Sequence, residues 1–331
     1  LLFSVFSAAG QLYRQFGPPV CPDSLIEEMT QYIQMHLDRP MSMEDLCARF
    51  HVNKSTLCRR FKASVGLTVF QYILDSRLRR CRSDLAFTEL SIGEIAEKYG
   101  LPLLEHSIFE FYRAHGQEKV TLATPEARHV RDLWTDQLRA MIAPYKIDFG
   151  LLAGFVPLTN IVSDFPCLNV HPGDLTVMKD GRRYLVGLHS VPIELAILSG
   201  ATSLRSSVIL VQPYTPGASE MDSGPLLGIS EPCPADLMGH SLEELRAVFA
   251  ARKNEHRHGA NKDLLSIIAA ENQERLKEQG DWIVYPQAAE DFARGCFGRD
   301  EHGQLCWRED QLHAFQTVKT IEYGAVRRLI R

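Results

Sequence analysis

Three residues in the middle of the chain, Asn169, His171 and Asp222, are of types that together can move an acyl group onto an amine. Such a transfer passes through a tetrahedral oxyanion, to which an asparagine amide can donate a hydrogen bond. An imidazole can move protons at neutral pH, and a carboxylate can orient that imidazole or stabilise its charged form. Each residue also has an ordinary structural alternative, as a packed histidine, a strand-end turn residue or a loop cap.

The spacing of these residues predicts that they meet. Asn169 and His171 are two positions apart, so in a strand both side chains project from the same side. Asp222 stands in a loop rich in glycine and proline, after an expected strand at 207–211. Open α/β sheets bind ligands outside the carboxyl ends of their strands. We therefore expect the three side chains to converge in one cleft at that end of the sheet.

A second cluster of residues, earlier in the chain, has the types that contact DNA. Residues 43–50 and 54–62 have helical periods on either side of the short turn 51–53. In a helix-turn-helix, the second helix enters the major groove with its early residues on base edges. The predicted base-contacting residues are Lys54, Ser55, Thr56 and Arg59.

Basic side chains outnumber acidic ones around this second helix. Between residues 53 and 82 there are eight basic residues and one acid, Asp75. The excess suits contact with phosphates, although a solvated helix face is the common explanation of such a run. The eight basic residues are Lys54, Arg59, Arg60, Lys62, Arg77, Arg79, Arg80 and Arg82.

The elements that position these residues change in character along the chain. Apolar residues recur with helical spacing over short segments between 25 and 99, and Ser42 and Ser91 are expected to cap two of the helices. Residues 126–143 predict a longer helix, and the apolar run 147–153 predicts a strand buried on both faces. Further strands are expected at 168–170 and 207–211, helices at 191–199, 241–251 and 261–279, and an exposed loop at 252–262. This order predicts an all-α helix-turn-helix domain followed by an α/β domain with an open, mostly parallel sheet of the Rossmann type.

Composition excludes several other classes of protein. The chain has 331 residues, enough for two domains, and its net charge of −5 means that any nucleic-acid signal must be local. The eight cysteines form no Cys-x-x-Cys pair, which argues against a zinc or redox motif and favours a reducing cytoplasm. No apolar run approaches the length of a transmembrane helix, and we expect no metal site.

Residues 25–100 resemble the AraC-type DNA-binding domain. The matching residues are Tyr32-Ile33, the 43–50 helix, Leu57-x-x-x-Phe61-Lys62, Gly66, Tyr72-Ile73, Arg77-Leu78 and Ser91-Ile-x-Glu-Ile-Ala-x-x-x-Gly100. The resemblance implies a sequence-specific transcription regulator that binds double-stranded DNA. That family carries two helix-turn-helix units, and in the second Ser107 stands where an aromatic residue is expected. We therefore expect a complete first unit and an altered second unit.

Residues 95–331 resemble the catalytic domain of folate-dependent formyltransferases, of the glycinamide ribonucleotide and methionyl-tRNA type. The resembling strings are Leu151-Leu-Ala-Gly-Phe155, Leu168-Asn-Val-His-Pro172, Met221-Asp-Ser-Gly-Pro225 and Trp282-x-x-Tyr285-Pro286. The resemblance implies formyl transfer from 10-formyltetrahydrofolate to an amine that it does not identify, with catalytic roles for Asn169, His171 and Asp222. It also implies that Phe155, Val156 and Leu158 line the pocket for the folate pterin.

The formyltransferase resemblance is incomplete at its start. The first strand, the Gly-rich turn, the first helix and the second strand of that family have no counterpart here, so we expect a sheet that lacks two strands. An open sheet edge invites pairing between chains, so we expect the isolated chain to be marginally stable, oligomeric or poorly soluble. The expected division is a remnant at 1–24, the helix-turn-helix region at 25–94 and the formyltransferase-like domain at 95–331.

Three functions remain open at this stage. The first is a formyltransferase fused to a DNA-binding region. The second is an AraC-type regulator that carries an inactive or truncated enzyme domain. The third is a chimaera that is competent in neither activity.

Overall fold

The computed structural model describes residues 23–154, 159–213, 222–252 and 261–331. Contacts divide the chain between Glu105 and His106 into two compact units. We call residues up to 105 the helical unit and residues 106–331 the sheet unit. The helix over 92–99, where we expected the two regions to join, lies wholly in the helical unit.

The helical unit is built from short helices with well-defined N-terminal caps. Ser42 and Asp45, and likewise Ser91 and Glu94, form reciprocal capping boxes, as the sequence predicts. Thr68 begins a longer helix in the same way. The helices are α2 (Ser24–Met35), α3 (Met43–Arg49), α4 (Lys54–Val65), α5 (Val69–Phe87) and α6 (Ile92–Tyr99).

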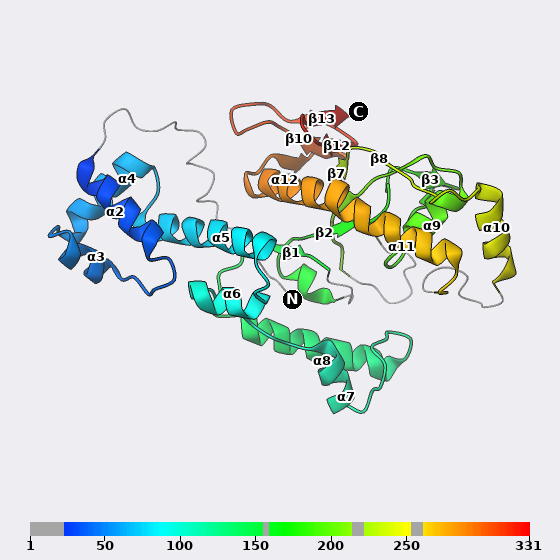
Figure 1. Ribbon diagram of the computed structural model, residues 1–331, viewed down its shortest axis with the longest axis horizontal. Helices are drawn as coiled ribbons and strands as arrows, with labels where there is room; N and C mark the ends of the chain where they lie inside the picture. Colours follow the sequence, from blue (N-terminus) through cyan, green and yellow to red (C-terminus); the bar gives the residue numbers. More distant parts are fainter. Residues whose placement is uncertain (1–22, 155–158, 214–221, 253–260) are drawn as a thin grey trace. The chain divides into compact units, whose positions relative to one another are not determined.

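These helices are drawn in blue to cyan in Figure 1, and one apolar core holds them together. Every helix contributes to it, because each presents an apolar stripe at the helical period. The fully buried members include Ile33 from α2, Leu46 from α3 and Phe61 from α4. Ile73 from α5 and Ile95 from α6 complete the cluster on its other side.

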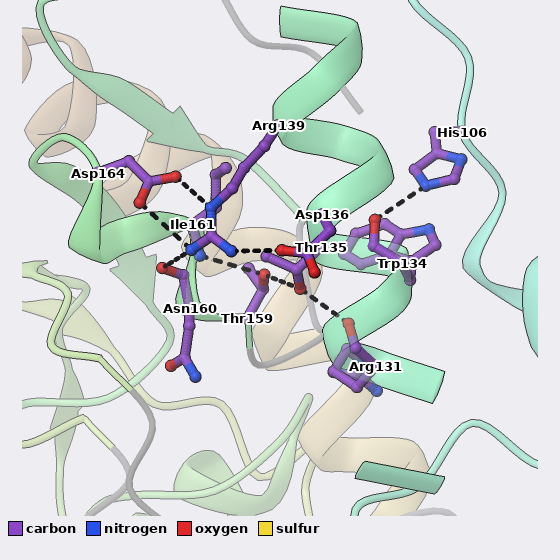
Figure 2. A network of polar contacts seen from close by, with 10 residues as sticks. All are labelled: His106, Arg131, Trp134, Thr135, Asp136, Arg139, Thr159, Asn160, Ile161 and Asp164. Atoms are coloured by element: carbon purple, nitrogen blue, oxygen red, sulfur yellow. Dashed lines mark hydrogen bonds and ion pairs between the residues drawn. The ribbon is translucent and has the colours of Figure 1, made fainter. Parts of the chain in front are cut away.

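The sheet unit begins with two helices, α7 (Ile108–Ala114) and α8 (Pro125–Ile142). Ser107 caps α7 by accepting a hydrogen bond from the backbone of Glu110. The His106 ring stacks on Trp134 of α8, with ring centroids 5.1 Å apart, and its Nε2 lies 3.1 Å from the Trp134 carbonyl oxygen (Figure 2). The helix expected at 126–143 is thus confirmed within one residue at each end.

Polar contacts fasten α8 to the 3-10 helix η2 (Asn160–Ser163). The hydroxyls of Thr135 and Thr159 lie 2.8 Å apart and are buried. The Arg139 guanidinium binds the Asp164 carboxylate, with Nε 2.5 Å from Oδ2 (Figure 2). In the chain, η2 lies between the first two strands of the sheet. These contacts therefore hold α8 next to the segment that joins those two strands.

The central sheet has six strands in the order β1-β2-β6-β7-β12-β13. Strands β1, β2, β7 and β12 run in one direction, while β6 and β13 run in the other. The expected open α/β sheet is therefore confirmed, in a mixed form. The strands are β1 (Gly150–Leu152), β2 (Cys167–His171), β6 (Ser207–Leu210), β7 (Leu226–Ser230), β12 (Thr320–Tyr323) and β13 (Arg328–Ile330).

Helices cover the sheet. A helical rod starts as α11 (Leu264–Leu276), continues through the π-helical turn η3 (Lys277–Asp281) and ends as α12 (Trp282–Ala293) (Figure 1). Helix α12 packs on β2, β6, β7 and β12, and α11 packs on α9 (Val191–Leu198) and α10 (Leu242–Ala251). Short strands complete the unit: β3 (Met178–Lys179) with β4 (Arg182–Arg183), β5 (Ser203–Leu204) with β8 (Cys233–Pro234), and β9 (Phe297–Arg299) with β10 (Leu305–Trp307) and β11 (Gln316–Thr317).

Two expectations of local structure are wrong. The strand expected at 207–211 does lie beside β2, but it runs antiparallel to β2. The carboxyl ends of the two strands therefore lie at opposite edges of the sheet. Arg252, which we expected in an exposed loop, is buried and binds the carboxylates of Glu194 and Asp263 at 2.8 and 2.7 Å. Among the described residues, no helix is long and apolar enough to span a membrane.

Candidate functional site

Strand β2 presents two of the predicted catalytic residues at its carboxyl end. Asn169 pairs with Leu152 on one side and with Ile209 on the other, and His171 pairs with Ser207. Two positions apart in a regular strand, Asn169 and His171 face the same side. The Asn169 side chain is half-buried, and its amide has no hydrogen-bond partner among the described residues.

The His171 imidazole is buried between two partners, with 3% of the residue exposed. Its Nδ1 lies 3.3 Å from Oδ2 of Asp222, and its Nε2 lies 2.7 Å from the carbonyl oxygen of Leu185. A carbonyl oxygen only accepts hydrogen bonds, so Nε2 must carry a proton. A proton placed between Nδ1 and the carboxyl group would make this contact favourable, because a bare nitrogen facing a bare carboxylate is repulsive.

Asp222 is held in an environment that favours sharing this proton. Burial raises the pKa of Asp222 above its usual value, while positive charge on His171 and Arg183 and the Gly187 amide oppose the rise. Its backbone has a φ of +61°, a left-handed conformation that few non-glycine residues adopt. Asp222 contacts His171 as expected. However, β6 runs antiparallel to β2, so Asp222 does not follow a strand whose carboxyl end lies beside that of β2.

The turn after β2 packs tightly against the imidazole. A Cβ atom on Gly173 would lie 2.6 Å from the Leu185 carbonyl oxygen and 2.9 Å from Nε2 of His171, so only glycine fits without a shift. The Ser207 hydroxyl donates to the Gly173 carbonyl at 2.7 Å and accepts from the Leu175 amide at 3.0 Å. Strand β6 therefore fixes the turn that orients His171.

A cavity of about 240 Å³ opens beside this turn. Gly173 and Leu185, which both contact the Nε2 side of His171, are part of its lining. Its charged lining residues are Asp174 and Arg205, whose Oδ2 and Nε atoms lie 3.7 Å apart. The cavity therefore lies against the turn and the carbonyl group that surround the His171 imidazole.

Sequence reasoning missed two groups at this site. Leu185 acts through its backbone carbonyl, which no residue type can signal, and Arg183 binds the backbone of Asp222 from a hairpin 39 positions earlier. Phe155, Val156 and Leu158, expected to line a folate pocket, lie outside the described residues.

The predicted helix-turn-helix is present in the helical unit. Asn53 caps α4 by accepting a hydrogen bond from the Thr56 amide at 2.8 Å, and Leu57 and Phe61 bury one face of the helix. Lys54, Ser55 and Arg59 are exposed, and Thr56 is half-buried. The expectation that 43–62 forms this motif with an exposed polar face on its second helix is confirmed.

Several of the basic residues around α4 have internal roles instead. Arg60 forms an ion pair with Asp23 at 2.6 Å, and this guanidinium lowers the pKa of Asp23. Arg77 donates to the backbone carbonyls of Leu37 and Arg39. The basic excess available to a partner is therefore smaller than the sequence count indicates.

Comparison with known proteins identifies the N-terminal part. Residues 46–117 match the helix-turn-helix domain family model. The xylose operon regulatory protein of Escherichia coli K12 is 30% identical over 93 residues, which are 28% of this chain and 24% of that protein. An uncharacterized HTH-type transcriptional regulator of Bacillus subtilis 168, YfiF, is 28% identical over 99 residues, 30% of this chain and 32% of that protein. The chain thus spans between a quarter and a third of the length of these relatives.

Solved structures also resemble the C-terminal part. The crystal structure of glycinamide ribonucleotide transformylase 1 from Symbiobacterium toebii is 19% identical, covers 64% of this chain and 72% of that one, and has a TM-score of 0.35. Because this TM-score is low, we infer the chemistry of the site only from the distances between its own residues. Residues 46–117 match a helix-turn-helix domain, and in the mixed α/β unit Nδ1 of the buried His171 lies 3.3 Å from the Asp222 carboxylate.

Proposed function

We propose that this chain joins a DNA-binding region, the helical unit, to an α/β domain, the sheet unit, that transfers a formyl group from 10-formyltetrahydrofolate to an amine. One observation carries the enzymatic part. His171 is buried with Nδ1 at 3.3 Å from Asp222 and with Nε2 at 2.7 Å from the Leu185 carbonyl. Asn169 is half-buried and projects from the same side of the same strand.

The residues present fit a formyl donor. An asparagine amide that has no hydrogen-bond partner among the described residues is a suitable hydrogen-bond donor for a formyl oxygen. We propose that Asn169 binds this oxygen and that Phe155, Val156 and Leu158 hold the pterin. The folate supplies the activated formyl carbon when it is bound.

The chain's own groups then handle charge and protons. The Asn169 amide stabilises negative charge that develops on the formyl oxygen, where a preorganised donor contributes most. The leaving nitrogen must gain a proton, which the His171–Asp222 pair can supply from the Nδ1 contact when it is protonated there, while the proton of the incoming amine passes to water. Asp222 stabilises the imidazolium before this transfer, and the Leu185 carbonyl keeps the ring in one orientation.

Formyl-transfer assays with a panel of small amines test the enzymatic proposal. We expect Asn169→Ala to lower the rate by about 10²–10³ and His171→Ala by about 10²–10⁴, with little change in folate binding measured by calorimetry. His129→Ala, at an exposed position of α8, is the matched control and should keep the wild-type rate. Unchanged transfer by His171→Ala would refute the catalytic role of His171.

We further propose that the helical unit binds duplex DNA, with Lys54, Ser55, Thr56 and Arg59 at its interface. The exposed residues of α4 and the match to the helix-turn-helix family model support this function. In duplex titrations at several salt concentrations, affinity should fall steeply with salt, and Arg59→Ala should weaken binding, reducing the salt slope by about 1 if it contacts a phosphate. Arg299→Ala, in the sheet unit, is the control. Salt-independent binding would contradict the proposal.

A further inference from the structure

The hairpin that follows the β2 turn reaches both members of the His171–Asp222 pair. Strands β3 and β4 pair Met178 with Arg183 around the two-residue turn Asp180-Gly181, whose φ angles are +52° and +74°. Two left-handed residues are the mark of a tight hairpin turn that suits the twist of the strands. The hairpin therefore holds Arg183 in one defined place.

The Arg183 side chain binds the backbone of the loop that carries Asp222 at two points. Its Nη1 donates to the carbonyl oxygen of Asp222, and its Nη2 donates to the carbonyl oxygen of Gly224 at 2.8 Å. A planar guanidinium suits this task, because its donors form a rigid fork. A Cβ atom on Gly224 would lie 1.8 Å from the Leu210 carbonyl oxygen, so the loop is also pressed against the end of β6.

The residues that follow Arg183 continue toward the pair at alternate positions. The Leu185 carbonyl accepts from Nε2 of His171, and the backbone amide of Gly187 opposes the rise in the pKa of the Asp222 carboxyl group. The segment 183–187 thus contacts the backbone of Asp222, its carboxylate and the opposite edge of the imidazole.

We propose that Arg183 is a positioning residue, which holds the Asp222 carboxylate against Nδ1 of His171. The left-handed backbone of Asp222 is less favourable than a helical or extended one, and the two hydrogen bonds from Arg183 stabilise it. Without the two hydrogen bonds from Arg183, the loop that carries Asp222 relaxes and its carboxylate moves away from Nδ1 of His171. The hydrogen bond between Nε2 of His171 and the Leu185 carbonyl remains. The catalytic consequence rests on the proposed formyl transfer, whereas the protonation of the ring can be measured without turnover.

Nitrogen NMR of the His171 imidazole tests the proposal in the full chain. Arg183→Met keeps the aliphatic stem and removes the donors, Arg183→Lys keeps the charge but loses the fork, and Arg182→Met changes the exposed neighbour on the same strand. We expect Arg183→Met to move the Nδ1 signal toward that of an unprotonated nitrogen and to leave Nε2–H in place. Arg183→Lys should give a smaller shift, and Arg182→Met should match the wild type.

Kinetics adds a second measurement. A carboxylate displaced by about 1 Å should lower kcat by about 10–100-fold in Arg183→Met, with the folate KM little changed. An unaltered Nδ1 signal in Arg183→Met, or the same change in Arg182→Met, would overturn the positioning role. If the wild type transfers no formyl group but its Nδ1 signal still responds to Arg183→Met, the proposed function fails and the positioning role stands.

Discussion

Replacing Gly173 by alanine should strain the site at its tightest contact. The added Cβ atom would meet the Leu185 carbonyl oxygen at 2.6 Å, Nε2 of His171 at 2.9 Å and Cβ of Pro192 at 2.9 Å. An ordinary contact begins at 3.4 Å, so the carbonyl has to retreat by about 0.8 Å. The backbone of Gly173 itself has no left-handed angle, so the cost comes from packing and not from conformation.

The magnitude follows from two effects. Overpacking a closely packed position costs about 1–3 kcal/mol. The retreat of the carbonyl also weakens its hydrogen bond to Nε2 of His171, now 2.7 Å long, which contributes about 1 kcal/mol. Gly173→Ala should therefore destabilise the sheet unit by about 2–4 kcal/mol and disturb the imidazole.

Tryptophan fluorescence in urea isolates the unit that carries the change. All three tryptophans, Trp134, Trp282 and Trp307, lie in the sheet unit, whereas far-ultraviolet circular dichroism reports on both units. We expect the fluorescence midpoint of Gly173→Ala to fall by roughly 1 M or more, with little change in slope.

Gly93→Ala is the matched control, with an effect of the opposite sign. Gly93 lies in helix α6, and an added Cβ would come no nearer than 3.8 Å to another residue. Alanine in a helix is favoured over glycine by about 0.5–1 kcal/mol, so the helical unit should gain stability while the fluorescence midpoint stays unchanged. A Gly173→Ala protein that unfolds at the wild-type urea concentration, with unaltered His171 signals, would refute the packing argument.

Two further predictions concern stability and assembly. The hydrogen bond from Arg252 lowers the pKa of Asp263 to about 2, below the value of about 3.9 in an unfolded chain. The ionised Asp263 therefore stabilises the sheet unit above about pH 4, and this contribution is lost as the pH falls toward 2. Asp263→Asn should lack about 2 kcal/mol of stability at neutral pH and show a shallower acid loss of the fluorescence midpoint; equal pH slopes would contradict this. Strand β1, from Gly150 to Leu152, pairs only with β2 among the described residues, so we expect concentration-dependent association in solution scattering, which a monodisperse monomer would exclude.

Much of the helical unit could be predicted because its signals are local. Ser42 with Asp45, and Ser91 with Glu94, are three residues apart, and each pair closes its capping box within one helical turn. The apolar period places Leu57 and Phe61 inside, which turns Arg59 outward. No distant contact is needed to make these assignments.

The candidate site could be predicted in part. The period of a strand places Asn169 and His171 on one side, and the residue types suggest Asp222 as their partner. The direction of β6 could not be predicted, because an apolar run reads the same in a parallel and an antiparallel strand. Likewise, β12 joins the sheet beside β7, about 90 positions earlier in the chain, through pairing that leaves no local pattern.

The sequence by itself determined which chemistry the chain carries: an amide and an imidazole on one strand, a carboxylate in a turn-rich loop, and a capped helix with a basic exposed face. Only the tertiary structure decided how those groups are used. It placed the Leu185 carbonyl on Nε2 of His171 and the Arg183 fork on the Asp222 loop. The physical reason is that both contacts involve backbone carbonyls brought together over 14 and 39 positions, and every residue has a carbonyl whatever its side chain.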